Sequence, residues 1–293
     1  MENSLIITEK PYVSKLLPTR PKNSNKGTYG TVLNLSGSSY YSGAAFLSSI
    51  SSLKVGAGLV RLASTEEVIR RVCALCADIT FINLGESDFG TIPKDGLKYL
   101  KNIKAPSAIS IGCGLTTFQP AREFTLKFLK EYENSSIPIV IDADALNILA
   151  QEKRKPIPLN SVMTPHPMEL SRLLKVDVNT IQEDRLKWAK EASSIFDCIV
   201  VLKGYETIIS IPGGNTFVNK TGNSALSHAG SGDVLCGMIA GFAAQGVKLE
   251  DACVLACYLH GRAGELASIK LTEYSATASD IVRYIPEAIK GII

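Results

Sequence analysis

The sequence predicts an α/β fold with a mostly parallel central sheet, and two observations predict it. Short apolar runs alternate with helical stretches from Thr31 to about Ala267, as expected where helices connect parallel strands. The runs are rich in Val and Ile and lack strict alternation of apolar and polar residues, which is typical of strands buried on both faces. We therefore expect helices on both faces of the sheet.

The apolar runs have the length and composition of buried strands. They are residues 32–35, 59–62, 79–84, 108–111, 138–141, 161–163 and 198–202. The pattern changes after Lys203, where two short β-rich runs, 207–211 and 216–219, are joined by Pro212-Gly213-Gly214-Asn215. This arrangement predicts a small β-hairpin.

Helices are expected between and after these strands. The predicted helices are residues 43–54, 120–133, 168–174, 179–195, 233–244, 249–267 and 276–290. No linker rich in Pro, Gly or Ser divides the chain, so we expect residues 1–293 to form one domain. Because residues 1–25 contain three prolines, we expect this segment to lie at the periphery or to reach a neighbouring subunit.

The composition narrows the class of protein. Of 293 residues, 45% are hydrophobic and 20% charged, which is typical of globular proteins. The net charge of +3 and the absence of a basic, aromatic-rich stretch argue against nucleic-acid binding. No window approaches about 18 apolar residues, so no membrane span is expected. The first four residues resemble no secretory signal, and we expect a cytoplasmic protein.

Seven cysteines are present, and two of them form a C-x-x-C pair. Cys73 and Cys76 have only Ala74 and Leu75 between them, and no second pair follows. Zinc ligation usually needs two such pairs, so we expect buried, reduced cysteines here.

The most informative stretch is a glycine-rich turn followed by an acid and an apolar helix, residues 227–237. The backbone N–H groups of Gly230, Ser231 and Gly232 are placed to bind an anion at a helix N-terminus. Asp233 follows in the first helical turn, where a carboxylate can act as a general base in phosphoryl transfer to a hydroxyl. A simple N-cap of small residues would give the same local pattern. Residues 230–233 are named the glycine turn below.

Other small or polar residues follow the predicted strands. Ligands of open parallel sheets bind beyond the carboxyl ends of the strands, so these segments are expected to gather at one edge with the glycine turn. The segments are residues 36–45, 111–115, 142–147, 164–169 and 203–204.

The chain has three histidines, and each lies in a different sequence context. His166 lies between two prolines, which stiffen its loop, and it is either a ligand or acid/base group or a structural hydrogen-bonding residue. His228 precedes the glycine turn, and His260 is expected to be structural. No cluster resembles a metal-ligand set, so Mg²⁺ is expected to arrive with nucleotide phosphates and to keep several waters.

Several motifs together resemble the NAD(P)H-hydrate dehydratase family. Residues 26–30, 37–45 and 55–60 resemble its first motifs, residues 142–147, 164–169 and 203–207 its next three, and Gly222-Asn223 with residues 229–237 its signature. The resemblance covers about residues 8–290. It implies a ribokinase-like three-layer α/β/α sandwich.

The resemblance also implies an activity. The family dehydrates the S epimer of hydrated NADH or NADPH (NADHX, NADPHX) at the expense of ADP or ATP, through a phosphorylated hydrate and loss of phosphate. It implies an epimerase on a separate chain as functional partner. It also suggests a homo-oligomer, with a tetramer among the candidates.

Site roles follow from the same resemblance. Asp233 would be the base, and the amides of Gly230, Ser231 and Gly232 would stabilise developing charge. The residues expected to contact the hydrate are Ala44, Gly114, His166 and Asp233. The residues expected to hold the adenine nucleotide are Lys203, Gly204, Tyr205, Glu206, Thr207 and Gly232. Further candidates are Asn147, Glu169 and Asn223.

Two departures from the family pattern stand out. The family often reads Gly-Pro-Gly-Leu-Gly where this chain has Cys113 and Thr116 at the second and fifth positions. Ser227-His228 stands where the family commonly has Ala-Thr. Neither departure removes a group that the mechanism needs.

Three alternatives compete with this interpretation. A small-molecule kinase of the same fold would share the glycine turn but release a stable phosphorylated product. A non-catalytic nucleotide sensor would be expected to lose Asp233 or the glycines. Nicotinamide redox catalysis is disfavoured, because no Gly-x-Gly-x-x-Gly follows the first strand with an acid about 20 residues on.

Overall fold

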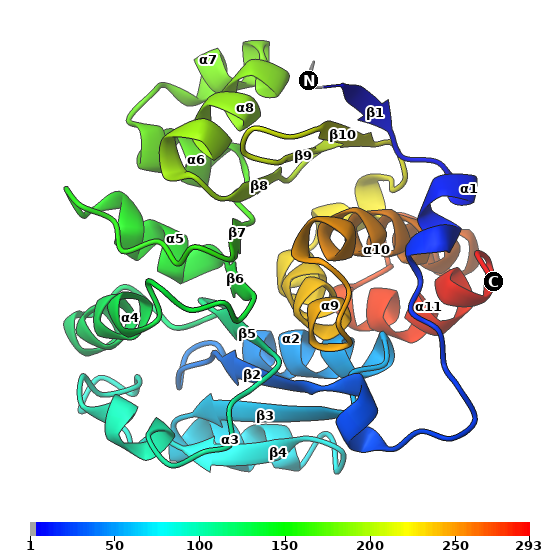
Figure 1. The fold of residues 1–293 in the computed structure, drawn as a ribbon. Helices are drawn as coiled ribbons and strands as arrows, with labels where there is room; N and C mark the ends of the chain where they lie inside the picture. The colour runs from blue at the N-terminus through cyan, green and yellow to red at the C-terminus, as the bar shows by residue number, and fades with distance from the viewer. Residues whose placement is uncertain (1–3) are drawn as a thin grey trace.

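The strands of the sheet are short and mostly buried. The computed structural model describes residues 4–293. Its strands are β1 (Leu5–Ile7), β2 (Thr31–Leu35), β3 (Leu59–Ser64), β4 (Thr80–Asn83), β5 (Ala108–Ile111), β6 (Ile139–Ile141), β7 (Ser161–Met163), β8 (Ile199–Leu202), β9 (Thr207–Ser210) and β10 (Thr216–Asn219). They form one sheet in the order β1-β10-β9-β8-β7-β6-β5-β2-β3-β4 (Figure 1).

The pairing confirms the predicted parallel sheet and hairpin. Strands β2 to β8 pair in parallel wherever they are neighbours, for example Val32 with Ala108 and Ile139 with Ser161. Strands β9 and β10 pair antiparallel and extend the sheet from β8. The carboxyl ends of β2, β5, β6, β7 and β8 therefore lie at one edge, side by side.

The helices agree with the prediction in most places. They are α1 (Lys10–Val13), α2 (Ser42–Lys54), α3 (Glu66–Cys73), α4 (Gln119–Glu131), α5 (Ala143–Ala150), α6 (Pro167–Leu174), α7 (Val178–Glu183), α8 (Arg185–Phe196), α9 (Ser231–Ala244), α10 (Leu249–Leu271) and α11 (Ala278–Lys290). The single helix expected over 179–195 is wrong. Asp184 interrupts it and starts α8, since its carboxylate accepts a hydrogen bond from the Lys187 amide (3.0 Å).

Two apolar cores lie on opposite faces of the sheet. Successive strand residues point to opposite faces, so Val32 packs toward α9 and α10 while Leu33 packs toward α4 and α6. Figure 1 shows α9, α10 and α11 on one side of the sheet and α4, α5 and α6 on the other. The expected three-layer sandwich is confirmed.

Helix α9 is buried along nearly its whole length, with 12 of its 14 residues buried. A methyl group added to Gly237 would lie 2.0 Å from the Ser48 carbonyl oxygen, so the two helix backbones touch there. A helix that is apolar all round is a core helix, which fits the uninterrupted apolar run in the sequence. This packing directs the N-terminus of α9 at the carboxyl edge of the sheet.

The N-terminal segment is partly built into the sheet. Leu5 pairs with Thr216 at the sheet edge, and the ring of Tyr12 lies 5.8 Å from that of Phe217. Residues 1–3 lie outside the described residues. The reach of residues 1–25 to a neighbouring subunit stays a prediction.

Two of the cysteines are more exposed than predicted. Cys73 is exposed and Cys76 partly exposed, so the prediction that this pair is buried is wrong, because the end of α3 faces solvent. The other five cysteines are buried. Within residues 4–293, no helix has the length and apolar character that crossing a membrane requires.

Candidate active site

The glycine turn begins α9 at the carboxyl edge of the sheet. Gly230 has φ +90°, a conformation that favours glycine, and a methyl group there would lie 2.6 Å from Cδ1 of Leu47. The first amides of a helix have no partner within the helix. The glycine turn therefore presents backbone N–H groups at the edge where the strand-end loops gather.

The amide and the hydroxyl of Ser231 both have hydrogen-bond partners within the chain. Its amide donates to the carbonyl of His228 (3.3 Å), and its hydroxyl lies 3.1 Å from Nε2 of His260. Burial lowers the pKa of His260 to about 4, so this imidazole is neutral and structural, as expected. The amides of Gly232 and Asp233 are thus better placed for an anion than that of Ser231.

An ion pair between a partly exposed lysine and a buried aspartate lies directly beneath the turn. Nζ of Lys203 lies 2.7 Å from Oδ1 of Asp142, which also accepts a hydrogen bond from the Thr164 hydroxyl (2.7 Å). A methyl group added to Gly232 would lie 3.3 Å from Nζ of Lys203. Burial disfavours the Lys203 ammonium, but Asp142 and Glu169 outweigh it and raise its pKa. The turn therefore has below it an ammonium group that is paired with a carboxylate.

The backbone around Asp142 is strained. Ala143, the first residue of α5, has φ +48°, in the left-handed region that costs a non-glycine residue about 1–2 kcal/mol. A methyl group added to Gly112 would lie 1.8 Å from the Asp142 carbonyl oxygen. Gly112 is thus required by its contact with the Asp142 backbone. Asp142 itself was absent from the predicted site residues.

Asp233 has the properties of a general base. Burial, together with the nearby Asp142 carboxylate, raises the pKa of Asp233 to about 6 from its ordinary 3.8. Cys113 and Lys203 act in the opposite direction. A carboxylate with a pKa close to neutral accepts a proton more readily than an ordinary aspartate.

His166 forms part of a helix cap. Its Nδ1 accepts hydrogen bonds from the amides of Met168 (3.1 Å) and Glu169 (3.3 Å), and Glu169 accepts one from the His166 amide (2.8 Å). Burial, Lys203 and Arg172 lower the pKa of His166, which favours neutral imidazole with its proton on Nε2. The structural role is observed, since Nδ1 caps α6 and Nε2 lies 3.6 Å from Oε1 of Glu169. The role of His166 as a ligand or acid/base group stays a prediction.

Glu169 links this cap to the ion pair. One carboxylate oxygen lies 3.8 Å from Nζ of Lys203, and burial raises the pKa of Glu169 to about 7. The predicted candidate Glu169 therefore belongs to the charged network under the glycine turn.

The loop after β8 is shaped by an arginine that the sequence analysis did not identify. The guanidinium of Arg185 donates to the carbonyls of Leu202 (3.1 Å), Lys203 (3.2 Å) and Tyr205. The Thr207 hydroxyl donates to the Gly204 carbonyl (3.0 Å). The loop is thus held from both sides.

Side chains of this loop differ in their exposure. Tyr205 is 83% exposed, and the carboxylate of Glu206 lies 3.8 Å from Nζ of Lys220. Of the predicted nucleotide residues, Lys203 and Gly232 are brought together, whereas Tyr205 projects into solvent.

The predicted hydrate residues Ala44 and Gly114 are neighbours. A methyl group added to Gly114, which has φ +66°, would lie 2.9 Å from Cβ of Ala44 and 2.7 Å from Cβ of Tyr41. Packing within the chain is therefore sufficient to require glycine there. Thr116 adopts φ +68°, a strained conformation for a β-branched residue, at the position where the family often has glycine.

Exposed aromatic side chains flank this loop. The rings of Tyr40 and Phe118 lie 5.7 Å apart, and Phe89 lies 6.0 Å from Phe118. All three are more than 40% exposed. The adjacent tyrosines at 40 and 41, in a loop otherwise made of small residues, were the signal that the sequence analysis did not use.

A cleft of about 550 Å³ adjoins the site between α5 and α6. Asn147 lies in its wall and accepts a hydrogen bond from Arg172 (2.8 Å). Lys175 and Asp144 also line it. The predicted candidate Asn147 thus lies beside two cations, whereas Asn223 is used inside the chain, capping residues 224–227 and donating to Ser268 (2.8 Å).

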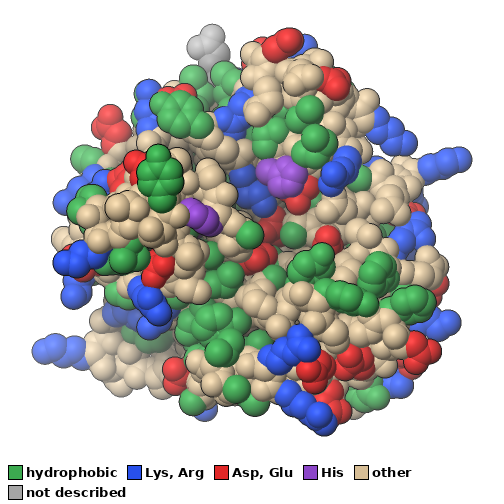
Figure 2. Space-filling model, turned by 180° about the vertical axis from the view of Figure 1, so that it is seen from behind, with side chains coloured by type: hydrophobic (Ala, Val, Ile, Leu, Met, Phe, Trp, Pro, Cys, Tyr) green, Lys and Arg blue, Asp and Glu red, His purple; other side chains and the backbone are tan. Residues whose placement is uncertain are grey.

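Figure 2 shows the molecule from behind the view of Figure 1, with histidine side chains near a hollow in which acidic side chains are visible. His260 is buried, whereas His166 is exposed and His228 partly exposed. Acidic and basic groups thus gather at a concave face, as in a polar ligand site.

Comparison with known proteins decides the family. A profile of the NAD(P)H-hydrate dehydratase family matches residues 32–287. The chain belongs to this family.

Curated relatives and solved structures agree with this assignment. The ADP-dependent (S)-NAD(P)H-hydrate dehydratase of Bacillus subtilis is 32% identical over 283 residues, which covers 95% of this chain and 96% of that protein. A crystal structure of the ADP/ATP-dependent NAD(P)H-hydrate dehydratase from Bacillus subtilis, co-crystallised with ATP/Mg²⁺, superimposes with a TM-score of 0.85 at 30% identity, covering 98% of this chain and 99% of that one.

Longer relatives also match. The bifunctional NAD(P)H-hydrate repair enzyme of Moorella thermoacetica is 38% identical over 282 residues, which covers 94% of this chain and 52% of that protein. The chain spans about half the length of the bifunctional relatives it matches.

Few side chains of this NAD(P)H-hydrate dehydratase family member are arranged as metal ligands are. Among residues 4–293, the one convergent group of three or more His, Cys, Asp or Glu ligands is Cys113, Asp142 and Cys236. Two thiols do not suit Mg²⁺, which prefers oxygen ligands. The described side chains therefore supply no dedicated magnesium cage.

Proposed function

We propose that this chain dehydrates the S epimer of NADHX or NADPHX and consumes ADP or ATP. Family membership and the named activities of the Bacillus subtilis relatives support this activity. The observation that carries the proposal is the position of Asp233, with a pKa of about 6, in the first turn of α9 above the Lys203–Asp142 pair.

The first step is phosphoryl transfer to the hydrate. The hydroxyl oxygen of the hydrate attacks the terminal phosphorus of the nucleotide, and its proton moves to the Asp233 carboxylate. The bond between that phosphorus and the bridging oxygen breaks, so AMP leaves from ADP, or ADP from ATP. The amides of the glycine turn and the ammonium of Lys203 stabilise the negative charge on the transferring group.

The second step expels phosphate. The ring nitrogen donates its lone pair as the C–O bond to phosphate breaks, and loss of a proton from the adjacent ring carbon restores the dihydronicotinamide. Phosphorylation is needed because hydroxide is a poor leaving group. Asp233 therefore acts in the first step, and the second is driven by the chemistry of the ring.

The substrate is placed by the surrounding groups. Ala44 and Gly114 would contact the hydrated ring, and Nε2 of His166 would donate to it. The cations Arg172 and Lys175 in the adjoining cleft suit the phosphates of the dinucleotide. The Lys203–Thr207 loop, with exposed Tyr205, would hold the adenine nucleotide.

Further expectations belong to this proposal. Mg²⁺ would bind to the nucleotide phosphates and neutralise part of their charge, and no step is assigned to it. An NAD(P)H-hydrate epimerase is the expected functional partner, in line with the bifunctional relatives. A homo-oligomer, with the tetramer as one form, and a cytoplasmic location stay predictions.

The deciding experiment follows the return of dihydronicotinamide absorbance when the chain is given NADHX, Mg²⁺ and ADP or ATP. Nucleotide-dependent recovery, with AMP or ADP formed in equal amount, supports the proposal and identifies the phosphoryl donor. If the folded chain binds nucleotide but restores no absorbance, the activity is wrong and a small-molecule kinase becomes the better interpretation.

A further inference from the structure

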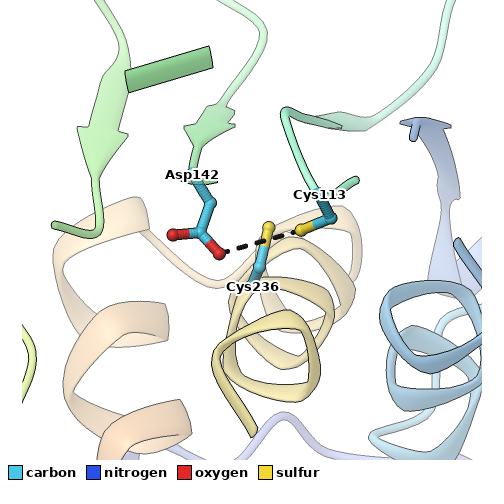
Figure 3. A group of neighbouring side chains, drawn as sticks. All are labelled: Cys113, Asp142 and Cys236. Atoms are coloured by element: carbon cyan, nitrogen blue, oxygen red, sulfur yellow. Dashed lines mark hydrogen bonds between the residues drawn. The ribbon is translucent and has the colours of Figure 1, made fainter. Parts of the chain in front are cut away.

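Three buried side chains converge below the glycine turn. Cys113 lies in the β5–α4 loop, Asp142 follows β6, and Cys236 lies in the second turn of α9. Their ligand atoms all lie within 4.8 Å of one another, and each residue is at most 1% exposed. Figure 3 shows the three side chains pointing toward one another. They are named the thiol cluster below.

One carboxylate oxygen of Asp142 faces the thiol cluster. Oδ1 of Asp142 is used by Lys203 and Thr164, whereas Oδ2 lies 3.7 Å from Sγ of Cys113. The thiol cluster therefore offers two sulfurs and one oxygen without breaking the ion pair. Soft divalent cations prefer such thiolate-rich sets, whereas Mg²⁺ does not.

The dimensions of the thiol cluster suit a tetrahedral ion. Zn²⁺ binds cysteine sulfur at about 2.3 Å, which places two sulfurs about 3.8 Å apart at tetrahedral geometry. Since the ligand atoms lie within 4.8 Å of one another, the cluster has to contract by no more than about 1 Å. Side-chain rotation can supply a change of this size.

A divalent cation is compatible with the charge balance of the site. Contact with the Cys236 thiol, and burial, raise the pKa of Cys113 well above its usual range. The pKa of Cys236 is raised too, since burial and nearby carboxylates outweigh its hydrogen bond with Cys113. A thiol has to lose its proton to bind a metal, so binding is expected to depend on pH and to release protons. A divalent cation that displaces both thiol protons into solvent leaves the net charge of the buried site unchanged.

We propose that Cys113, Cys236 and Asp142 bind one soft divalent cation, of the class of Zn²⁺ or Cd²⁺, and that this ion inhibits the site above it. A methyl group added to Gly232 would lie 4.0 Å from Oδ2 of Asp142, so the ion would lie immediately under the glycine turn. There it replaces the thiol proton of Cys113 and thereby alters the contact of Cys113 with Asp233, the proposed base. The inhibition rests on the proposed function, but the binding does not.

Binding is tested with Cd²⁺ on a chain carrying Cys73→Ser and Cys76→Ser, which removes the exposed thiols. We expect one Cd²⁺ per chain, an ultraviolet cadmium–thiolate charge-transfer band, and release of about two protons per ion. Cys236→Ala should weaken binding by more than about a hundredfold, because loss of a ligand exceeds the effect of losing its hydrogen-bond partners. Cys198→Ala, at another buried cysteine, is the matched control and should bind normally.

Each outcome bears on the site. Absence of the band in the folded chain, or a band that persists in Cys236→Ala, overturns the assignment. Circular dichroism and thermal melting of each variant establish that it is folded. Should Cys236→Ala not fold, Cys113→Pro, which introduces the residue common in the family, provides the same test.

Inhibition is measured on the same chain by the hydrate assay. We expect one equivalent of Cd²⁺ to abolish nucleotide-dependent recovery, and a chelator to restore it. If Cd²⁺ binds to an active chain without inhibiting it, the proposal that the bound ion inhibits the site is wrong. If Cd²⁺ binds but the metal-free chain has no activity with either nucleotide, the proposed function fails while the metal site stands.

Discussion

Nζ of Lys203 lies 2.7 Å from Oδ1 of Asp142, and the two residues are 61 positions apart in the chain. The pair joins the end of β8 to the end of β6, across the intervening strand β7. Asp142 is 1% exposed, and its Oδ1 contacts both this ammonium and the Thr164 hydroxyl. Because the pair lies under the glycine turn, it also fixes the charge that a bound phosphate meets.

We expect Lys203→Met to destabilise the fold by about 3–5 kcal/mol, because it leaves a buried carboxylate without its cation. Adding Asp142→Asn removes that charge and should recover much of the loss. Urea denaturation of the single and double variants measures the coupling. Equal destabilisation of the single and the double variant would contradict the coupling between Lys203 and Asp142. Lys220→Met is the control, since its pair with Glu206 is exposed and should change stability by less than about 1 kcal/mol.

Asp233→Asn should lower turnover by at least about a hundredfold, the smallest effect usual for a general base, while the chain still binds nucleotide. The amide keeps the shape of the side chain but cannot take the proton of the attacking hydroxyl. Turnover is measured by the hydrate assay and binding by calorimetry. Asp88→Asn, at an exposed acid, should leave both unchanged. Residual activity above about a hundredth of wild type would exclude Asp233 as the base.

The activity should fall as the pH is lowered through about 6, because Asp233 is then protonated and cannot act as a base. A pH–rate profile of kcat/KM in the wild type measures this limb. The limb should not lie near pH 4, where an ordinary aspartate would place it. If the variant His166→Asn shows the same fall in activity at about pH 6, titration of His166 is not its cause.

Because its pKa is raised, the ionised form of Asp233 lowers the free energy of unfolding at neutral pH. Its folded pKa of about 6 lies above its ordinary 3.8, so the protonated acid favours the folded state. This contribution is complete below pH 3.8 and is lost as the pH rises through about 6. Asp233→Asn should therefore raise the free energy of unfolding by roughly 1–3 kcal/mol at about pH 8, and by much less at about pH 4. Equal effects at both pH values would show that Asp233 is not perturbed.

The sheet was predictable because its strands are buried on both faces and therefore read as apolar runs. Strand β5 was predicted at its observed bounds, Ala108–Ile111. The edge strand β1 was not predicted, since Leu5–Ile7 is only three residues long and depends on pairing with a hairpin more than 200 residues away. The break between α7 and α8 depends on one cap, at Asp184, inside an otherwise helical pattern.

The candidate site was predictable only as far as local patterns reach. The glycine turn and Asp233 carry a signature in consecutive residues. Asp142 and Arg185 act on Lys203 and its loop through the folded chain, so no spacing in the sequence reveals their roles. Gly114 was predicted to contact the hydrate, and the structure gives contact with Tyr41 and Ala44 as a sufficient reason for glycine at this position.

The exposed ring of Tyr205 provides the last prediction. A tyrosine that is 83% exposed adds little to the core, and the loop that carries it is held by Arg185 rather than by the ring. If the ring stacks on the adenine base, Tyr205→Ala should raise the KM for the nucleotide by about tenfold, since stacking of a base on an aromatic side chain contributes about 1–3 kcal/mol. Tyr205→Phe should keep the wild-type KM, because stacking needs the ring and not the hydroxyl. Tyr274→Ala, at a tyrosine that is 94% exposed in another loop, is the matched control. Steady-state kinetics with the hydrate saturating separates the two constants, and a loss of kcat at unchanged KM would show that Tyr205 does not bind the base.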